Sequence, residues 1–246
     1  MKRSLHIAST LVLALGFACV AHGSESKAST IVAPVTASAS TTFSSSSGNN
    51  YSILHTIDQS GLSLGYVSGE TDFDSYLAGN PTHTSLANGN EWFSQDYGRR
   101  RIASQVVTYG FGALTSINGF ALWNEEFAGI GTTQLWWSAA IDGEFTLLDT
   151  IVPLDTAFGT PNYSAQEFQF AAIDMLFFRL VISDCLGPPR RESNYRGCGI
   201  GEVAFSAILP SGPDDNNPIV PLPAALPLLV SALGFLVWAG RRRKAI

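Results

Sequence analysis

Apolar side chains in the central part of the chain occur in short runs of strand length, separated by turns rich in Gly, Asn and Pro. Residues 116–125 carry apolar or small side chains at every second position, which predicts a strand with one buried face. Residues 133–150 hold two apolar segments on either side of Asp142-Gly143. This dipeptide suits the positive φ angles of a tight hairpin turn.

Two further runs have the character of strands. Residues 175–183 are continuously apolar and rich in aromatic and β-branched side chains, which favours a strand buried on both faces, although periodicity alone does not separate it from a helix. Residues 199–209 alternate at Val203, Phe205 and Ala207 and predict a closing strand. Short strands between such turns predict an all-β sandwich or jelly roll.

Composition divides the chain into a leader, one domain and a tail. Residues 24–50 are dominated by Ser, Thr and Ala and have too few large apolar side chains for a core, so we expect a disordered leader. Residues 210–219 form a Pro, Asp and Asn linker. The segment between them, residues 51–209, is long enough for a single well-buried domain.

The first 23 residues have the order of a secretory signal peptide. Two cations precede a short apolar stretch, residues 5–20, and small residues suit cleavage after Gly23. The alternative is an uncleaved anchor, but the apolar stretch is short for a membrane span. A lipidated Cys19 is a further alternative, although the aliphatic residue expected three positions before it is missing.

The part between the signal peptide and the tail is strongly acidic. The chain has 14 Lys and Arg against 20 Asp and Glu, and six of the cations lie in the two terminal segments. Residues 24–219 therefore carry 8 cations against 20 carboxylates, a net charge of −12. Because nucleic acid and anionic lipid require clustered cations, we predict no nucleic-acid partner.

Cys185 and Cys198 remain after removal of the signal peptide. An exported protein meets an oxidising compartment, so the pair predicts a disulfide. A metal site would need further ligands nearby, and no His follows His83 in the chain.

The order of these segments resembles that of discoidin-like domains, the galactose-binding-like jelly rolls. The resemblance covers about residues 80–206. The matching pieces are a Ser–Asp–Gly hairpin with one extra residue, an Arg-bearing strand and a final Glu-Val strand: 138–143, Phe178-Arg179-Leu180 and Glu202-Val203. It implies a discoidin-like jelly-roll sandwich. The cysteine pair departs from the family, in which a disulfide typically ties the two ends of the domain.

Catalytic constellations are scarce in this sequence. Nucleophilic catalysis usually needs a His base, and only His55 and His83 lie in the domain, both in polar, turn-like segments. Adjacent Glu125 and Glu126 would point to opposite faces of a strand, so we interpret them as solvated charge. We predict a protein that is not an enzyme. The alternative is a glycan-active enzyme that uses surface carboxylates.

No cofactor is predicted, with structural calcium as the one exception. Asp72 and Asp74 alternate, so they can share a face and hold Ca²⁺ together with loop carbonyls. The discoidin-like resemblance also implies a structural calcium, since many such domains carry one.

Aromatic and Arg side chains are the candidates for ligand contact. Sugar rings commonly stack on Trp or Tyr in jelly rolls, and three Trp residues lie within fifteen positions: Trp123, Trp136 and Trp137. Neighbouring Trp136 and Trp137 must point to opposite faces of one strand, so one can be core. The loop between the cysteines adds a second group that suits a sugar acid or a protein carboxylate: Arg190, Arg191, Tyr195 and Arg196.

The C-terminal residues 220–246 combine a short Pro motif, an uncharged apolar span and a basic end. The span, residues 224–240, is at the short end for a transmembrane helix, and the cations keep the terminus cytoplasmic. This order resembles the VPLPA variant of the PEP-CTERM bacterial sorting signals. The matching residues are the motif Val220, Pro221, Leu222, Pro223 and Ala224 and the basic stop Arg241, Arg242, Arg243 and Lys244.

The sorting resemblance implies a Gram-negative host and an exosortase partner that cleaves near the Pro motif. The protein would be exported, held transiently in the inner membrane by its C-terminal helix, and then passed to the cell surface or matrix. We therefore expect a non-catalytic extracellular or cell-surface protein that binds exopolysaccharide or matrix. A purely structural surface protein without a ligand is the remaining alternative.

Overall fold

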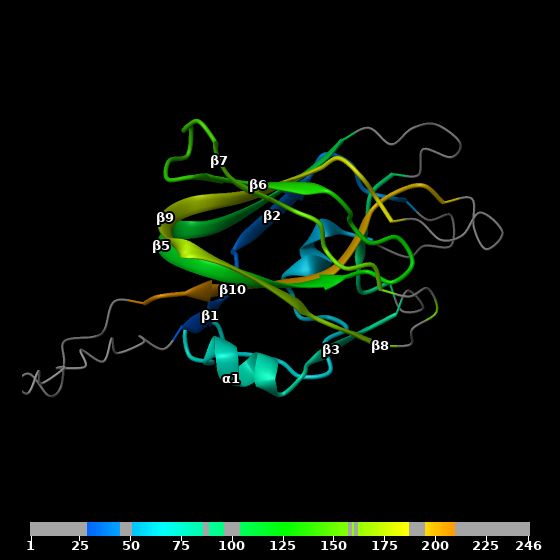
Figure 1. Cartoon of the computed structure of the whole chain (residues 1–246), viewed down its shortest axis with the longest axis horizontal. Helices are drawn as coiled ribbons and strands as arrows, with labels where there is room; N and C mark the ends of the chain where they lie inside the picture. Colours follow the sequence, from blue (N-terminus) through cyan, green and yellow to red (C-terminus); the bar gives the residue numbers. More distant parts are fainter. Residues whose placement is uncertain are drawn as a thin grey trace, which may run out of the picture.

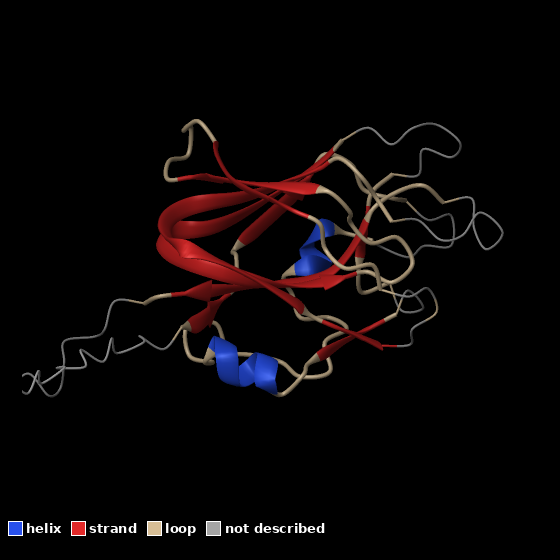
Figure 2. Ribbon diagram, viewed as in Figure 1, coloured by secondary structure: helices blue, strands red, loops and turns tan. Residues whose placement is uncertain are grey.

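The computed structural model is an antiparallel β-sandwich built mainly from one large sheet that folds over on itself (Figures 1 and 2). It describes residues 29–44, 51–85, 89–95, 104–156, 159, 162–186 and 195–209. Its elements, in chain order, are β1 (Thr30–Val32), β2 (Thr36–Ala39), η1 (Ile53–Thr56), α1 (Phe73–Ala78), β3 (Thr82–Thr84), β4 (Trp92–Phe93), β5 (Gln105–Asn124), β6 (Thr133–Ser138), β7 (Thr146–Ile151), β8 (Asn162–Ser164), β9 (Gln166–Ile182) and β10 (Gly199–Ala207).

The large sheet has the strand order β1-β10-β5-β9-β6-β7, with β2 paired to β5 and β4 paired to β10. β5 and β9 are long, and their pairing shifts register between Gly110 and Thr115, where Gly112 has a φ of 76°. Both strands bend there and pass from one layer to the other (Figure 1). We call the layer with β2, β6 and β7 the β6 layer, and the layer with β1, β4 and β10 the β10 layer.

The core lies between the inner faces of the two layers. Alternate residues of β5 point into it from the β6 layer, including Val107 and Tyr109, and Phe120 and Leu122 do so after the bend. Phe120, Phe178 and Phe205 meet at its centre with ring centroids 5.2 to 6.0 Å apart. Full burial of each such ring stabilises the fold by roughly 1.5–3 kcal/mol.

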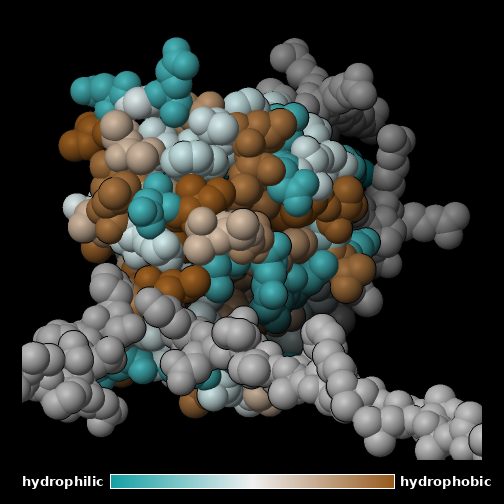
Figure 3. All heavy atoms as spheres, turned by 60° about the vertical axis from the view of Figure 1, so that its left-hand side comes forward, coloured by the Kyte–Doolittle hydropathy of each residue, from teal (hydrophilic) through white to brown (hydrophobic). Residues whose placement is uncertain are grey.

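The two outer faces differ. On the β10 layer, Ala121, Trp123 and Ala204 are buried under α1 and the separate β3–β8 pair, which supply an apolar cover of their own: Phe73, Tyr76 and Tyr163. The β6 layer lies on the opposite side of the sandwich from α1, β3 and β8 (Figure 1). Around the bend of β5 and β9, apolar and hydrophilic residues intermingle on the surface (Figure 3).

The predicted all-β sandwich and its main strands are confirmed, with three corrections. Residues 30–39 of the predicted disordered leader form β1 and β2, because backbone pairing with β10 and β5 orders a segment that is poor in large side chains. The β6–β7 hairpin does not turn tightly at Asp142-Gly143; residues 139–145 form a longer loop with a Gly143 N–H bond to the Ala140 carbonyl. The run at residues 175–183 alternates between buried and partly exposed positions, so only one of its faces is core.

The predicted terminal segments lie outside the described residues. These are the signal peptide, the linker at residues 210–219 and the sorting segment with its apolar span. Within the described part of the chain, no helix has the length and apolar character needed to cross a bilayer.

Candidate functional site

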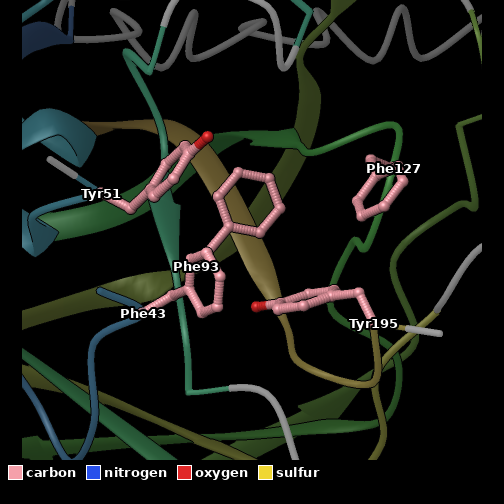
Figure 4. Close-up of a pocket in the computed structure, with 5 residues that line it drawn as sticks. All are labelled: Phe43, Tyr51, Phe93, Phe127 and Tyr195. Atoms are coloured by element: carbon pink, nitrogen blue, oxygen red, sulfur yellow. The ribbon is translucent and has the colours of Figure 1, made fainter. Parts of the chain in front are cut away.

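An aromatic hollow of about 200 Å³ opens among loops that flank the sandwich (Figure 4). All five residues that line it are aromatic, and they come from distant parts of the chain: Phe43, Tyr51, Phe93, Phe127 and Tyr195. Phe93, Tyr51 and Tyr195 are almost fully buried, whereas Phe43 and Phe127 are partly exposed. Phe127 stands opposite the other rings, 5.8 Å from Tyr195 between centroids. The hollow is smaller than typical drug-sized pockets of about 300–1,000 Å³ and suits one ring-sized group.

The predicted disulfide between Cys185 and Cys198 is confirmed and supports one wall of this hollow. Its Cα atoms are 4.9 Å apart, and it ties the end of β9 to the start of β10. Close to it, the Tyr195 hydroxyl donates to the Ser94 carbonyl at 2.6 Å, and the Cys198 N–H donates to the Ser94 hydroxyl at 2.9 Å. The ring of Tyr195 is therefore held in a defined position.

Buried carboxyl groups lie behind the hollow. Glu125 is fully buried, and its Oε2 accepts the backbone N–H groups of Phe127 at 2.8 Å and Ala128 at 2.6 Å, so it shapes the loop that carries Phe127. Glu126 accepts the Gly159 N–H at 2.9 Å. Glu91 is fully buried as well, and neither of its carboxylate oxygens has a hydrogen-bond partner among the described residues.

Burial dominates the electrostatics of this group. It raises the pKa of Glu91 to about 8 and raises the pKa of Glu125 well above its usual range, with neighbouring carboxylates adding to both effects. The interpretation of Glu125 and Glu126 as solvated charge is wrong, because both side chains are buried.

His83 is a basic residue beside one of these carboxyl groups, with its Nδ1 4.0 Å from Glu91 Oε1. Its ring nitrogens lie 2.8 Å from the Thr84 carbonyl and 3.0 Å from the Ser60 carbonyl, and the Tyr163 hydroxyl is 3.0 Å from Nδ1. Burial lowers its pKa, while the two carbonyls oppose that shift by favouring the protonated ring. The predicted turn-like setting of His83 is wrong, since it is fully buried in β3.

The three candidate Trp residues occupy three different environments. Trp123 is fully buried under α1 and donates its indole N–H to the Pro81 carbonyl at 2.9 Å, so it offers no surface to a ligand. Trp137 packs against the core from β6. Trp136 points to the other face of the same strand and remains partly exposed, with its indole N–H 3.3 Å from Gln134 Oε1.

The candidates in the cysteine loop are only partly described. Tyr195 lines the hollow, and Arg196 donates from its guanidinium to the Tyr195 carbonyl at 2.7 Å. Arg190 and Arg191 lie outside the described residues. The structure thus brings one of the four predicted loop residues directly into the hollow.

Asp72 and Asp74, the proposed calcium pair, belong to the start of α1. Asp72 is the N-cap, and its carboxylate accepts the Ser75 N–H at 2.8 Å. Hydrogen bonding with the side chain and the backbone of Ser75 holds the pKa of Asp72 below the usual range. Asp74 is exposed in the first turn of the helix. In the described part of the chain, no group of three His, Cys, Asp or Glu side chains gathers closely enough to hold a metal ion.

Sequence reasoning missed four of the five residues that line the hollow: Phe43, Tyr51, Phe93 and Phe127. They lie in segments that are far apart in the chain, so no local spacing connects them. Phe127 directly follows the acidic pair Glu125-Glu126, and this was the one local signal of an unusual loop.

Together the strand pairings and the hollow define an antiparallel β-sandwich with an aromatic site among its loops. No family model and no curated protein matches the chain. Among solved structures it is similar to a CBM32 module, CpGH89CBM32-5, from Clostridium perfringens in complex with GalNAc-β-1,3-galactose, at 15% identity, over 69% of this chain and 93% of that one, with a TM-score of 0.45.

Two further structures are similar over comparable lengths. The family 32 module of Clostridium perfringens NanJ in complex with galactose has 14% identity, 72% and 98% coverage and a TM-score of 0.44. Chitosan-binding module 1 of a chitosanase/glucanase from Paenibacillus sp. IK-5 has 15% identity, 71% and 95% coverage and a TM-score of 0.43. With identities and TM-scores this low, these likenesses carry no conclusion about the ligand of this chain, and its fold class rests on its own strand pairings.

Proposed function

We propose that this chain is an exported, non-catalytic protein that an exosortase passes to the cell surface, where its sandwich domain binds polysaccharide. Export is supported by the signal-peptide order of the first 23 residues and by a disulfide, which persists in oxidising compartments. Sorting is supported by the Val220–Ala224 motif, the uncharged span after it and the four cations that follow.

We further propose that the sandwich domain is a discoidin-like jelly roll. The three motif pieces that suggest this family lie at the β6–β7 hairpin, on β9 and on β10, and these strands are joined through β5 in one sheet. Their order along the chain and their common sheet both support the assignment.

The aromatic hollow is the observation that carries the binding function. Sugar rings present apolar C–H faces that pack on aromatic rings, and partly exposed Phe43 and Phe127 offer such surfaces beside buried Tyr195. The acidic character of residues 24–219 argues against a nucleic-acid ligand at the same place.

A catalytic role is disfavoured by the burial of the acid–base groups. Glycoside hydrolysis needs two carboxyl groups that reach the scissile bond. Glu91 and Glu125 have no exposed surface, and His83 is equally inaccessible. In this arrangement they support the loop that carries Phe127 and the β3 strand beneath it.

Binding is tested with the full-length chain in mild detergent on immobilised neutral, anionic and cationic polysaccharides. We expect retention on at least one polymer and a loss of about tenfold in affinity for Phe127→Ala, since a stacked ring at the centre of a site contributes on this scale. Leu114→Ala, which removes a 59% exposed apolar side chain at the β5 bend, is the matched control and should bind normally. Absence of binding to every polymer would contradict the proposal and leave a purely structural surface role.

Sorting is tested by mass spectrometry of the protein from the surface of an exosortase-bearing host. We expect a mature C-terminus at or near residues 220–224. Surface-located chains that still end at Ile246 would refute processing and leave a permanent anchor.

A further inference from the structure

The outer face of the β6 layer presents a second aromatic surface, away from the hollow. Residues of β5, β9 and β6 that alternate with core residues point outward here, and α1 and the β3–β8 pair cover the other layer instead (Figure 1). We call the following six residues the outer-face platform: Thr108, Gln134, Trp136, Phe145, Leu147 and Arg179.

Strand register places the central members of the platform side by side. Trp136 on β6 is paired directly with Arg179 on β9, which is paired in turn with Thr108 on β5. On its other side, Trp136 is paired with Leu147 on the edge strand β7. Leu147 is 46% exposed. Directly paired side chains on one face are close enough to act together.

Arg179 is held in place, and no carboxylate of the described residues neutralises it. Its guanidinium carbon lies 3.4 Å from the centre of the Phe145 ring, and its Nε donates to the Thr108 hydroxyl at 3.0 Å. No ion pair to Arg179 exists within the described part of the chain, even though the domain is acidic. The remaining guanidinium N–H groups are therefore available to a ligand beside the indole.

We propose that the outer-face platform binds a neutral polysaccharide chain. The indole of Trp136 would pack against the face of a sugar ring, while Arg179 and Gln134 would hydrogen-bond its hydroxyl groups. A polyanion is disfavoured by the net charge of −12 on residues 24–219, and a polycation is disfavoured by Arg179 at the centre. The inference rests on the proposed function for its class of ligand, a polysaccharide. It adds that this polysaccharide is uncharged and that it binds on a surface separate from the hollow.

The experiment measures affinity of the full-length chain for a neutral glucan, a neutral galactan, polygalacturonate and chitosan. We expect a neutral polymer to bind best, with little change on adding salt, because screening weakens only charge-driven contacts. Trp136→Ala and Arg179→Ala should each weaken that binding by about tenfold. Leu114→Ala, which removes an exposed apolar side chain outside both the hollow and the platform, is the control and should bind normally. Phe127→Ala, in the hollow, is measured alongside and reports on the proposed function alone.

Two conservative variants separate binding from folding. Trp136→Phe keeps an aromatic ring and should still bind measurably. The fluorescence change that the neutral polymer causes should be smaller in this variant than in the unmodified chain, whereas a purely structural role of Trp136 would leave that change intact. Arg179→Lys keeps the charge and loses the planar donor group, so it should bind almost as weakly as Arg179→Ala. Circular dichroism and melting temperature confirm that each variant is folded.

The outcomes distinguish the two proposals. Binding of a neutral polymer that depends on Trp136 and Arg179 supports the platform. Binding that depends on Phe127 but not on Trp136 or Arg179 overturns the platform and leaves the proposed function standing. Preference for polygalacturonate or chitosan overturns the neutral-chain assignment, and absence of binding to all four polymers overturns both proposals.

Discussion

Glu91 is a buried carboxyl group in an unusual environment. It is fully buried, neither carboxylate oxygen has a hydrogen-bond partner among the described residues, and His83 Nδ1 lies 4.0 Å from its Oε1. A buried charge without partners is costly, so the carboxyl group responds by holding its proton. Burial accordingly raises its pKa to about 8, and the repulsion of Glu126 acts in the same direction.

We expect Glu91 to make the domain less stable as the pH rises from about 4.5 to about 8. The folded state retains a proton on Glu91 across this window, whereas the unfolded chain releases it near 4.5, the ordinary pKa of a Glu side chain. Each unit by which folding raises the pKa of Glu91 lowers the free energy of unfolding by about 1.4 kcal/mol at a pH above both pKa values. Thermal melts at closely spaced pH values measure the slope.

Glu91→Gln should make the fall of melting temperature with pH shallower, because a neutral amide replaces the titrating group. Part of the pH dependence should remain, because burial also raises the pKa values of Glu125 and Glu202. Asp142→Asn, at an exposed position in the hairpin loop, is the control and should leave the slope unchanged. An identical slope in Glu91→Gln and the unmodified chain would refute the assignment.

At the scale of elements, α1 shows how one short helix covers the β10 layer. It has six residues, and Phe73 and Tyr76 on one side pack into the cluster with Trp123. Such a short helix is marginal by itself, so its start must be stabilised by capping. Asp72 does this by accepting the Ser75 N–H, which explains its position without a metal ion.

We expect Asp72→Ala to destabilise the domain by about 1 kcal/mol, the usual cost of losing an N-cap, and Asp72→Asn to restore most of that loss. Chemical denaturation of the two variants measures the difference. The capping role would be refuted by two results together: Asp72→Asn does not restore the stability lost in Asp72→Ala, and Ca²⁺ raises the melting temperature of the unmodified chain but not of either variant. Asp72 and Asp74 would then be assigned to a calcium site.

At the scale of the whole molecule, the disulfide connects the two layers. Cys185 follows β9 in the β6 layer, and Cys198, fully buried, precedes β10 in the other layer. The sandwich is also tied by β5 and β9, which run through both layers. Local opening at the loops therefore has to work against a covalent link next to the aromatic hollow.

We expect the double variant Cys185→Ala/Cys198→Ala to be less stable by about 3 kcal/mol, the chain-entropy value for a loop of roughly this size. Urea denaturation under oxidising conditions compares it with the unmodified chain. A reducing agent should lower the stability of the unmodified chain to a similar degree and leave the variant unchanged. Equal stability of the two chains in oxidising buffer would contradict a structural role for the bond.

Sequence reasoning succeeded where the information is local. Alternation in β5 and β10 and the apolar segments of the β6–β7 hairpin identified these strands, because side-chain period follows directly from strand geometry. It failed for β1 and β2, whose small polar residues carry no periodic signal and are ordered by pairing with distant strands. It also failed for Glu125, since exposure depends on how the following loop folds back.

The sequence by itself therefore determined the all-β class, the cysteine pairing and the opposite orientation of Trp136 and Trp137, which all follow from short-range geometry or from a single covalent choice. Only the tertiary structure decided that Trp123 is core, that Phe43, Phe93 and Phe127 meet in one hollow, and that Arg179 lies beside Trp136 with no carboxylate partner among the described residues. These relations join residues far apart in the chain, and long-range register between strands sets them.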